Sequence, residues 1–133
     1  MIDEVVHIFD SIRKKYVVLT PEEWVRQHFV QAMITKKGYP AERIRLEFAI
    51  DYHGLTKRPD VAFYDLDGKE EILIECKAPE VKLTEDVFLQ IATYFSICKP
   101  RLLVLTNGLE HIYAQVQPNE PKIVYIKDLP DYR

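Results

Sequence analysis

A nearly all-apolar run at residues 102–106, LLVLT, constrains the fold of this chain more than any other feature. Its length suits a strand, and a strand without polar alternation is expected where both faces of a sheet are covered. Helical patterns on either side of the run in sequence can supply the covering layers. The run therefore predicts an α/β fold, in which a mixed sheet lies between helices.

Two segments have the spacing of amphipathic helices, with an apolar residue every three or four positions. In residues 2–16 these positions are Val5, Ile8, Phe9 and Ile12. In residues 84–98, which begin at the capping residue Thr84, they are Val87, Ile91, Tyr94 and Phe95. We expect a helix in each segment.

Residues 21–36 have the clearest helix signals in the chain. Thr20 is a suitable N-cap, Pro21 fits the first helical position, and Gly38 stands where a C-cap belongs. One stripe of this helix is expected to pack against the sheet: Trp24, Val25, His28, Phe29, Ala32 and Met33.

Strand patterns complete the expected sheet. Residues 44–50 alternate apolar and polar side chains, as a strand with one buried face does. Two runs, 61–66 and 71–77, flank Asp67-Gly68, a dipeptide that supplies the positive φ angles of a tight hairpin. Two more strands are expected after the apolar run, at 111–117 and 123–127.

The second strand of this hairpin carries a carboxylate and an amine on one face. Because side chains alternate along a strand, Glu75 and Lys77 point the same way, opposite to the apolar Ile72 and Ile74. Asp60 begins the partner strand, which brings its carboxylate beside Glu75. Two carboxylates this close repel each other unless a cation lies between them, and oxygen ligands suit Mg²⁺ or Mn²⁺. The residues predict a metal site for phosphoryl chemistry, in which Lys77 can orient or deprotonate the attacking water.

The spacing of these residues resembles the motif of the PD-(D/E)xK nuclease superfamily: Pro59-Asp60, then fourteen residues, then Glu75-Cys76-Lys77. Over about residues 16–108, the chain also resembles the N-terminal nuclease domain of type I restriction enzyme R subunits. The segments that carry this resemblance are Thr20-Pro21-Glu22-Glu23 with Arg26, Gly38-Tyr39-Pro40, Arg58-Pro59-Asp60, Asp67-Gly68, Ile74-Glu75-Cys76-Lys77-Ala78-Pro79, Gln90 with Tyr94, and Thr106-Asn107-Gly108. The resemblance implies a restriction-endonuclease-like core, a mixed β-sheet flanked by α-helices.

The resemblance also implies roles for individual residues. Asp60 and Glu75 would ligate Mg²⁺ (or Mn²⁺), with the backbone carbonyl of Cys76 as a further ligand, and Lys77 would assist the water. Glu23 would complete the site as a helix carboxylate and metal ligand. Two residues on one face of the later helix would lie beside the metal, where they would touch DNA or hold the lysine: Gln90 and Tyr94.

Simpler interpretations exist for the same residues. Glu75 and Lys77 can form a surface ion pair, and Asp60 can be a turn residue after proline. Glu23 fits a capping box with the threonine three residues before it, and in that role it needs no metal. Gln90 can be a plain polar residue, and Tyr94 can belong to the core. The combination of Asp60, Glu75 and Lys77 at this spacing is what favours a metal site.

Net charge limits the nucleic-acid interpretation. The chain carries 18 basic and 21 acidic side chains, a formal charge of −3, whereas strong non-specific DNA binders are usually basic. Lys57 and Arg58 are weak candidates for contacts with phosphates, because cations in loops are usually just solvated. The charge motivates a second hypothesis, in which the chain is a non-catalytic module that keeps the nuclease fold for DNA binding or assembly.

Composition narrows the remaining classes. No apolar run approaches the roughly 20 residues needed to span a membrane, and the N-terminus lacks the pattern of a secretion signal. We therefore expect a single cytoplasmic domain over residues 1–133. Cys76 and Cys98 fit reduced thiols, and the four isolated histidines argue against a zinc site.

The leading expectation is a Mg²⁺-dependent DNA endonuclease that hydrolyses phosphodiester bonds with metal-activated water. It would be a stand-alone relative of the type I nuclease domain, because the chain has no GxxxxGK[ST] phosphate loop for a helicase. RNA and branched DNA stay open as substrates. A homodimer, or a partner protein that supplies DNA targeting, stays open as an assembly.

Overall fold

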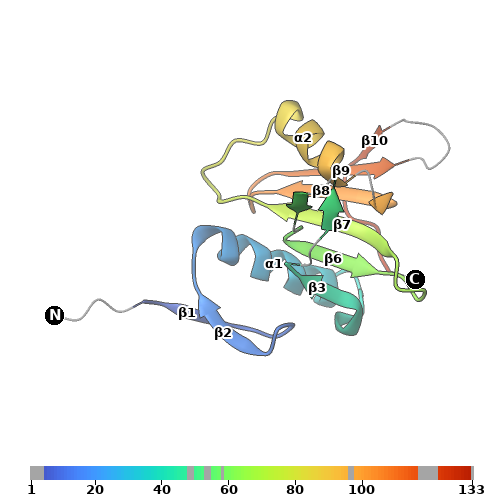
Figure 1. Cartoon of the computed structure of the whole chain (residues 1–133). Helices are drawn as coiled ribbons and strands as arrows, with labels where there is room; N and C mark the ends of the chain where they lie inside the picture. The colour runs from blue at the N-terminus through green and yellow to red at the C-terminus, as the bar shows by residue number, and fades with distance from the viewer. Residues whose placement is uncertain are drawn as a thin grey trace.

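A six-stranded mixed sheet forms the centre of the protein, in the order β10-β9-β8-β7-β6-β3 (Figure 1). The computed structural model describes residues 5–47, 50–52, 55–57, 59–95, 98–116 and 123–132. The strands of this sheet are β3 (Ile44–Leu46), β6 (Val61–Tyr64), β7 (Glu70–Cys76), β8 (Leu102–Thr106), β9 (His111–Val116) and β10 (Ile123–Ile126). Only β7 and β8 pair in parallel within it.

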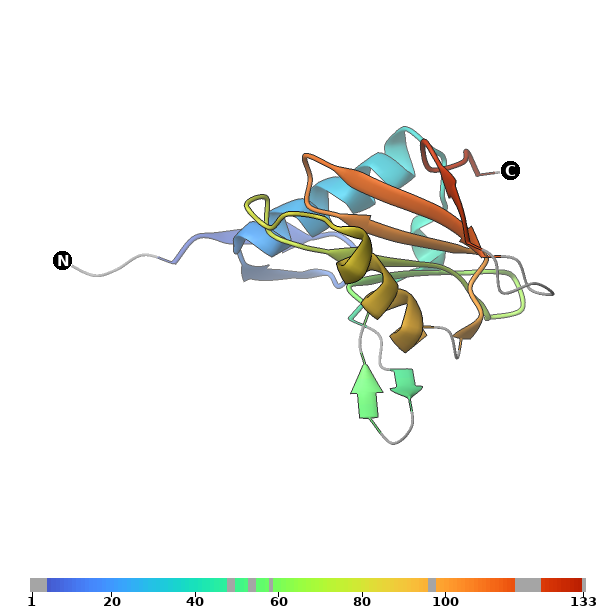
Figure 2. The ribbon, with the colours of Figure 1, turned by 90° about the horizontal axis from the view of Figure 1, so that it is seen from above.

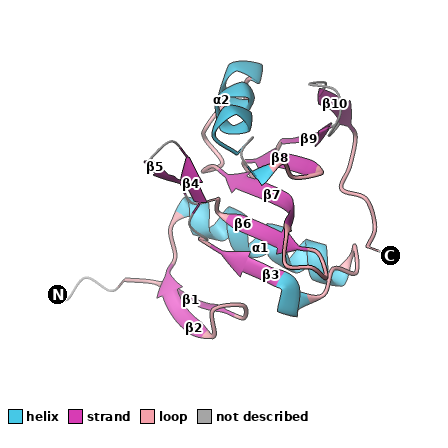
Figure 3. Cartoon of the chain, turned by 45° about the vertical axis from the view of Figure 1, so that its right-hand side comes forward, coloured by secondary structure: helices cyan, strands magenta, loops and turns pink. Residues whose placement is uncertain are grey.

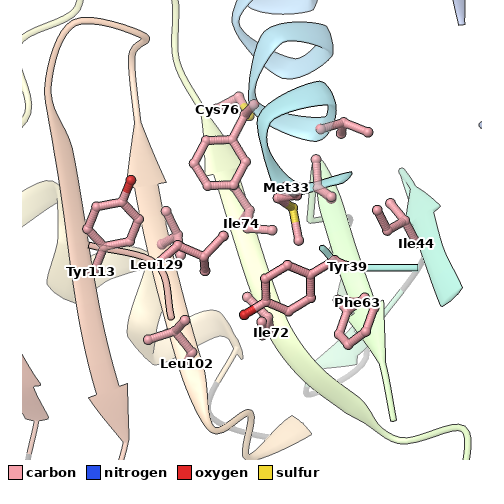
Figure 4. Close-up of a cluster of buried hydrophobic side chains, with 14 of the residues drawn as sticks. Met33, Tyr39, Ile44, Phe63, Ile72, Ile74, Cys76, Leu102, Tyr113 and Leu129 are labelled. Carbon is pink, nitrogen blue, oxygen red and sulfur yellow. The ribbon is translucent and has the colours of Figure 1, made fainter. Parts of the chain in front are cut away.

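The two helices α1 (Pro21–Thr35) and α2 (Glu85–Phe95) cover opposite faces of the sheet (Figure 2). Side chains of β7 alternate between two cores: Ile72 and Ile74 pack on the side of α1, and Leu73 packs on the side of α2. Figure 4 shows the first core, where Met33 and Tyr39 meet the sheet. Every residue of β8 is buried, so the predicted strand covered on both faces is confirmed, and with it the predicted α/β class.

Helix α1 begins and ends where the sequence predicts. The hydroxyl of Thr20 accepts the backbone N–H of Glu23 at 3.0 Å. Gly38 adopts a φ of +80° after the last turn, a conformation that glycine reaches at little cost. The backbone N–H of Tyr39 then bonds to the carbonyl of Met33 at 3.0 Å. These contacts satisfy backbone groups that a helix end leaves without partners.

The predicted buried stripe of α1 is only partly correct. Val25, Phe29 and Met33 are buried, but Trp24 is 49% exposed and His28 is also exposed. These two rings pack on each other outside the core, with centroids 4.0 Å apart. The helix is turned so that a polar row, Glu23, Arg26 and Gln27, is buried in place of the tryptophan.

The predicted helix over residues 2–16 is wrong. The chain forms a hairpin of β1 (His7–Asp10) and β2 (Lys15–Val18), which lies beside the start of α1 (Figure 1). The carboxylate of Asp10 accepts the backbone N–H groups of Ile12 and Arg13, both at 2.9 Å, and Lys14 adopts a φ of +58°. This turn reverses the chain, and the β-branched residues on either side of it suit strands.

The predicted strand over residues 44–50 is too long. β3 ends at Leu46, and Glu47 has a φ of +54°, which breaks the extended chain. The next two strands, β4 (Ile50–Tyr52) and β5 (Leu55–Lys57), were not predicted; they pair in a small separate sheet (Figure 3).

The remaining predicted elements are confirmed. β6 and β7 form the expected hairpin, with Gly68 at a φ of +80° in its turn. The hydroxyl of Thr84 accepts the N–H of Val87 at 3.2 Å at the start of α2, and β9 and β10 follow β8. Cys76 and Cys98 are free cysteines; Cys76 is buried, whereas Cys98 is only half-buried. Of the helices in the described part of the chain, none combines the length and apolar character needed to cross a membrane.

Candidate active site

The register of the β6–β7 hairpin brings two carboxyl groups together. Val61 pairs with Ile74, so Asp60, one residue earlier, comes opposite Glu75. The two side chains are hydrogen-bonded to each other. The oxygen Oδ2 of Asp60 also accepts the backbone N–H of Cys76 at 2.7 Å. The pairing of Asp60 with Glu75 that the sequence predicted is therefore present.

Lys77 lies beside this pair, at the end of β7. Its Nζ is 3.9 Å from Oε2 of Glu75. Its backbone N–H donates to the carbonyl of Thr106 at 2.8 Å, which ties the residue to β8. The lysine is half-buried, with 33% of its side chain exposed, so its amine can reach both Glu75 and solvent.

The backbone of Cys76 faces the same edge as Asp60. Successive residues of a strand direct their N–H and C=O groups to opposite sides. Lys77 directs its N–H to β8, so Cys76 directs both groups toward β6, and its N–H does meet Asp60 there. The carbonyl of Cys76 is therefore on the side of the Asp60 carboxylate, where the sequence predicts a ligand.

The charge balance of this pair is unusual. Burial, and then the hydrogen bond that the protonated Glu75 donates to Asp60, raise the pKa of Glu75 to about 9, although Lys77 acts to lower it. The pair therefore holds a proton near neutral pH. In the described ranges, no three His, Cys, Asp or Glu side chains come together as a metal site. Two carboxylates and a backbone carbonyl form a small set of hard oxygen donors, which fits a divalent ion that also keeps water ligands.

The sequence suggested that Glu23 is either a metal ligand or part of a capping box, but its carboxylate has a different environment. Its carboxylate accepts Nε of Arg26, Nε2 of Gln27 and Nη2 of Arg13, each at 2.9 Å, and also Nη2 of Arg26. Burial acts to raise the pKa of Glu23, but the hydrogen bonds from Arg26 and Gln27 outweigh it and lower the pKa to about 2. A metal ion at Glu23 would have to displace these donors. Thr20 caps the N–H of Glu23, but the carboxylate is bound by side chains.

An ion cluster joins Glu23 to the carboxyl pair. Arg26 bonds to Glu23, and its Nη1 lies 3.5 Å from Oδ1 of Asp60 and 3.3 Å from Oε1 of Glu47. A cavity of about 290 Å³ opens here, between the β1–β2 hairpin, the start of α1 and Asp60. The cluster and Asp60 therefore line the same cavity.

The other predicted site residues are not brought to the carboxyl pair by any described contact. Gln90 is exposed on α2, and among the described residues it makes no hydrogen bond with Asp60, Glu75 or Lys77. Tyr94 and Lys57 lie in α2 and β5, with only their backbone described, and Arg58 lies outside the described residues. Their roles stay predictions.

Sequence reasoning did not assign a role to the arginines of the cluster. Glu23 and Arg26 are three residues apart, a spacing that places ion pairs on one helix face, so this contact had a signal in the sequence. Arg13 had none, because it meets Glu23 and Glu47 through the hairpin that replaces the predicted helix.

The chain is similar to known proteins over most of its length. A family model described as type I restriction enzyme R protein N terminus matches residues 21–130, and no curated protein matches the chain. A solved structure from Anabaena variabilis, titled as a candidate nuclease belonging to DUF820, has a TM-score of 0.51 and 12% identity, and the match covers 95% of this chain and 79% of that chain. At this identity the likeness shows the fold, and it confirms the predicted restriction-endonuclease-like core. The family match confirms the resemblance seen in the sequence: the chain belongs to the family of type I restriction enzyme R protein N termini.

Proposed function

We propose that this chain is a divalent-metal-dependent nuclease that hydrolyses phosphodiester bonds of DNA, with Asp60, Glu75 and Lys77 as its active site. The observation that carries the proposal is the half-buried Asp60–Glu75 pair, whose two carboxyl groups lie side by side and whose described ion pairs, with Arg26 and Lys77, are long ones. Membership of a restriction-enzyme family supports DNA as the substrate.

Asp60, Glu75 and the carbonyl of Cys76 are the groups that would hold Mg²⁺ or Mn²⁺. When bound, the ion would offset the charge that develops on the phosphate and make a water easier to deprotonate. Glu75 would have to lose its proton to serve as a ligand, since only the ionised carboxylate binds a metal well. We leave Glu23 out of the ligand set because Arg13, Arg26 and Gln27 already occupy its oxygens.

Lys77 is the residue that acts on the attacking water or on a phosphate oxygen. Its amine lies next to Glu75 and is partly exposed, so it can donate a hydrogen bond to a group placed over the carboxyl pair. The bond from its backbone N–H to Thr106 keeps the start of the side chain fixed, and a fixed donor contributes more than a mobile one. Gln90, Tyr94, Lys57 and Arg58 are proposed as residues that contact the DNA around this centre.

A second candidate function is a non-catalytic module that uses the same fold for DNA binding or assembly. It is favoured by the formal charge of −3, since DNA binding without a partner draws on positive charge. In this case a partner protein would supply cleavage or targeting.

The test is cleavage of supercoiled plasmid by the purified chain with Mg²⁺, Mn²⁺ or EDTA. We expect cutting that needs metal and that falls by about 10²–10⁴-fold in Lys77→Ala, the range for loss of a group that assists proton transfer. Lys69→Ala is the matched control, because Lys69 lies in the turn before β7, at the opposite end of that strand from Lys77.

The outcomes separate the two candidates. Equal cutting by wild type and Lys77→Ala would remove Lys77 from the mechanism. DNA binding at physiological salt without cutting under either metal would favour the non-catalytic module. RNA and branched DNA junctions, tested in parallel, decide the substrate class.

A further inference from the structure

Both oxygens of the Asp60 carboxylate face a donor. Oδ2 accepts the N–H of Cys76 at 2.7 Å, and Oδ1 lies 3.5 Å from Nη1 of Arg26. Asp60 stands in the bend before β6 rather than in a strand, so the ladder of the sheet does not fix its side chain. Metal-binding carboxylates are commonly oriented by such outer contacts.

Arg26 is itself held in one orientation. The residue is buried, and its Nε and Nη2 donate to the two oxygens of Glu23. Because a guanidinium is planar, this two-point contact fixes the direction of the remaining nitrogen. That nitrogen, Nη1, faces Asp60 and Glu47.

Glu23 is in turn held from the β1–β2 hairpin. Arg13, at the turn of this hairpin, donates Nη2 to Glu23 at 2.9 Å and Nη1 to Glu47 at 3.4 Å. Asp10 fixes Arg13 through its side chain and through the turn. The hairpin lies outside residues 21–130, the span that the family model matches, yet it is joined to Asp60 by this chain of contacts.

We propose that Arg26 is a positioning residue for Asp60, aimed by Glu23, and that Arg13 of the N-terminal hairpin keeps Glu23 in place. The proposal rests on the proposed function, because Asp60 is taken as a metal ligand. Arg26 would act on metal affinity through Asp60, without touching the metal or the DNA. The role of Glu23 is then to orient an arginine.

A lysine cannot replace Arg26 in this role. It keeps the charge, but its single ammonium cannot hold both oxygens of Glu23 and also present a separate nitrogen to Asp60. Arg26→Lys therefore separates the orienting contact from the charge. Arg101→Lys is the matched control, because Arg101 forms an exposed ion pair with Glu71 at the opposite end of β7.

The experiment measures Mn²⁺ binding to the full chain by calorimetry, with Mn²⁺ alone as the probe. We expect Arg26→Lys to bind Mn²⁺ about 10–100-fold more weakly than wild type, the range for loss of an outer-shell partner. Arg13→Gln should weaken binding in the same direction and less strongly. Arg101→Lys should bind as wild type does. A purely structural role for Arg26 would lower the midpoint of urea unfolding and leave the Mn²⁺ affinity of the folded protein unchanged.

Three results would overturn the proposal. Wild-type Mn²⁺ affinity in a folded Arg26→Lys would remove Arg26 as a positioning residue while leaving the proposed metal site standing. If Arg26→Lys does not fold, Arg13→Gln decides, and unchanged Mn²⁺ affinity in that variant overturns the chain of contacts. No Mn²⁺ binding by wild type would overturn the proposed function, and this proposal with it.

Discussion

Glu23 and Glu75 are both largely buried acids, and the protein treats them in opposite ways. Glu23, on α1, meets the guanidinium groups of Arg13 and Arg26 and the amide of Gln27, and its pKa falls to about 2. Glu75, at the end of β7, meets another carboxyl group and an amine 3.9 Å away, and its pKa rises to about 9. One acid is neutralised by cations of the chain itself. Glu75 has less positive charge near it, as expected at a site where a bound ligand supplies that charge.

The difference also separates stability from function. The ion cluster around Glu23 ties the hairpin, α1 and the end of β3 together. The Asp60–Glu75 pair places two acids side by side, which is unfavourable for the folded chain without a cation. Sites that bind charged ligands commonly carry such local costs. The contrast between the two glutamates can therefore be tested by stability as well as by activity.

The largest expected effect comes from replacing each glutamate by glutamine. Glu23→Gln should cost about 3 kcal/mol of the free energy of unfolding, because breaking a buried ion pair leaves arginine charge uncompensated. Glu75→Gln should raise the free energy of unfolding at pH 7, since the amide resembles the protonated carboxyl group of the folded chain and needs no proton to be taken up on folding. The measurement is urea unfolding at pH 7 without divalent metal.

Glu71→Gln is the control for this pair of variants. Glu71 pairs with Arg101, whose side chain is 62% exposed. Loss of this ion pair should lower the free energy of unfolding by no more than about 1 kcal/mol. Equal destabilisation by Glu23→Gln and Glu75→Gln would mean that the two acids are neutralised to the same degree, and the contrast would be wrong.

How well the sequence predicts each of these two regions depends on how close together in the sequence its residues lie. The Asp60–Glu75 pair depends on one hairpin, whose turn dipeptide and strand patterns lie within residues 60–77, so motif and register could be inferred together. The cluster around Glu23 depends on Arg13 and Glu47, which come from distant segments. No period or motif connects such residues before the fold is known.

The same reasoning explains where the elements were mispredicted. Residues 2–16 have helical spacing of apolar residues, but a side-chain contact of Asp10 closes a turn there, and periodicity does not contain that information. The sequence also suggested one core face for β7, whereas Leu73 packs in a second core under α2. Glu75, two residues further along the strand, lies on the same face of β7 as Leu73.

The next effect is the response of stability to a divalent ion. Mg²⁺ should stabilise wild type by about 2.7 kcal/mol at a concentration 100 times its dissociation constant, because the ion binds the folded chain. Glu75→Gln should gain much less, since it lacks one ligand, while Glu71→Gln, which changes an ion pair at the opposite end of β7, should gain as much as wild type. Thermal unfolding with Mg²⁺ or EDTA measures this. The same gain in Glu75→Gln would place the ion elsewhere on the protein.

The smallest expected effect is the change in the free energy of unfolding per unit of pH, measured without metal. For Glu75, the pKa is about 9 in the folded chain against an ordinary value of 4.5. Between these values the folded state holds a proton that the unfolded state has lost. Stability should therefore fall as pH rises across this window, by at most about 1.4 kcal/mol per pH unit.

Glu23 should produce the opposite slope in a different window. Its pKa is about 2 in the folded chain against an ordinary value of 4.5, so its contribution is complete above pH 4.5 and is lost as pH falls toward 2. Urea unfolding of wild type and Glu75→Gln at pH 5, 6, 7 and 8 isolates the first slope, because both proteins keep Glu23. The stability of wild type relative to the variant should decrease steadily with pH. Parallel curves would mean that Glu75 is already ionised at pH 5, and the protein's own cations would then neutralise it as they neutralise Glu23.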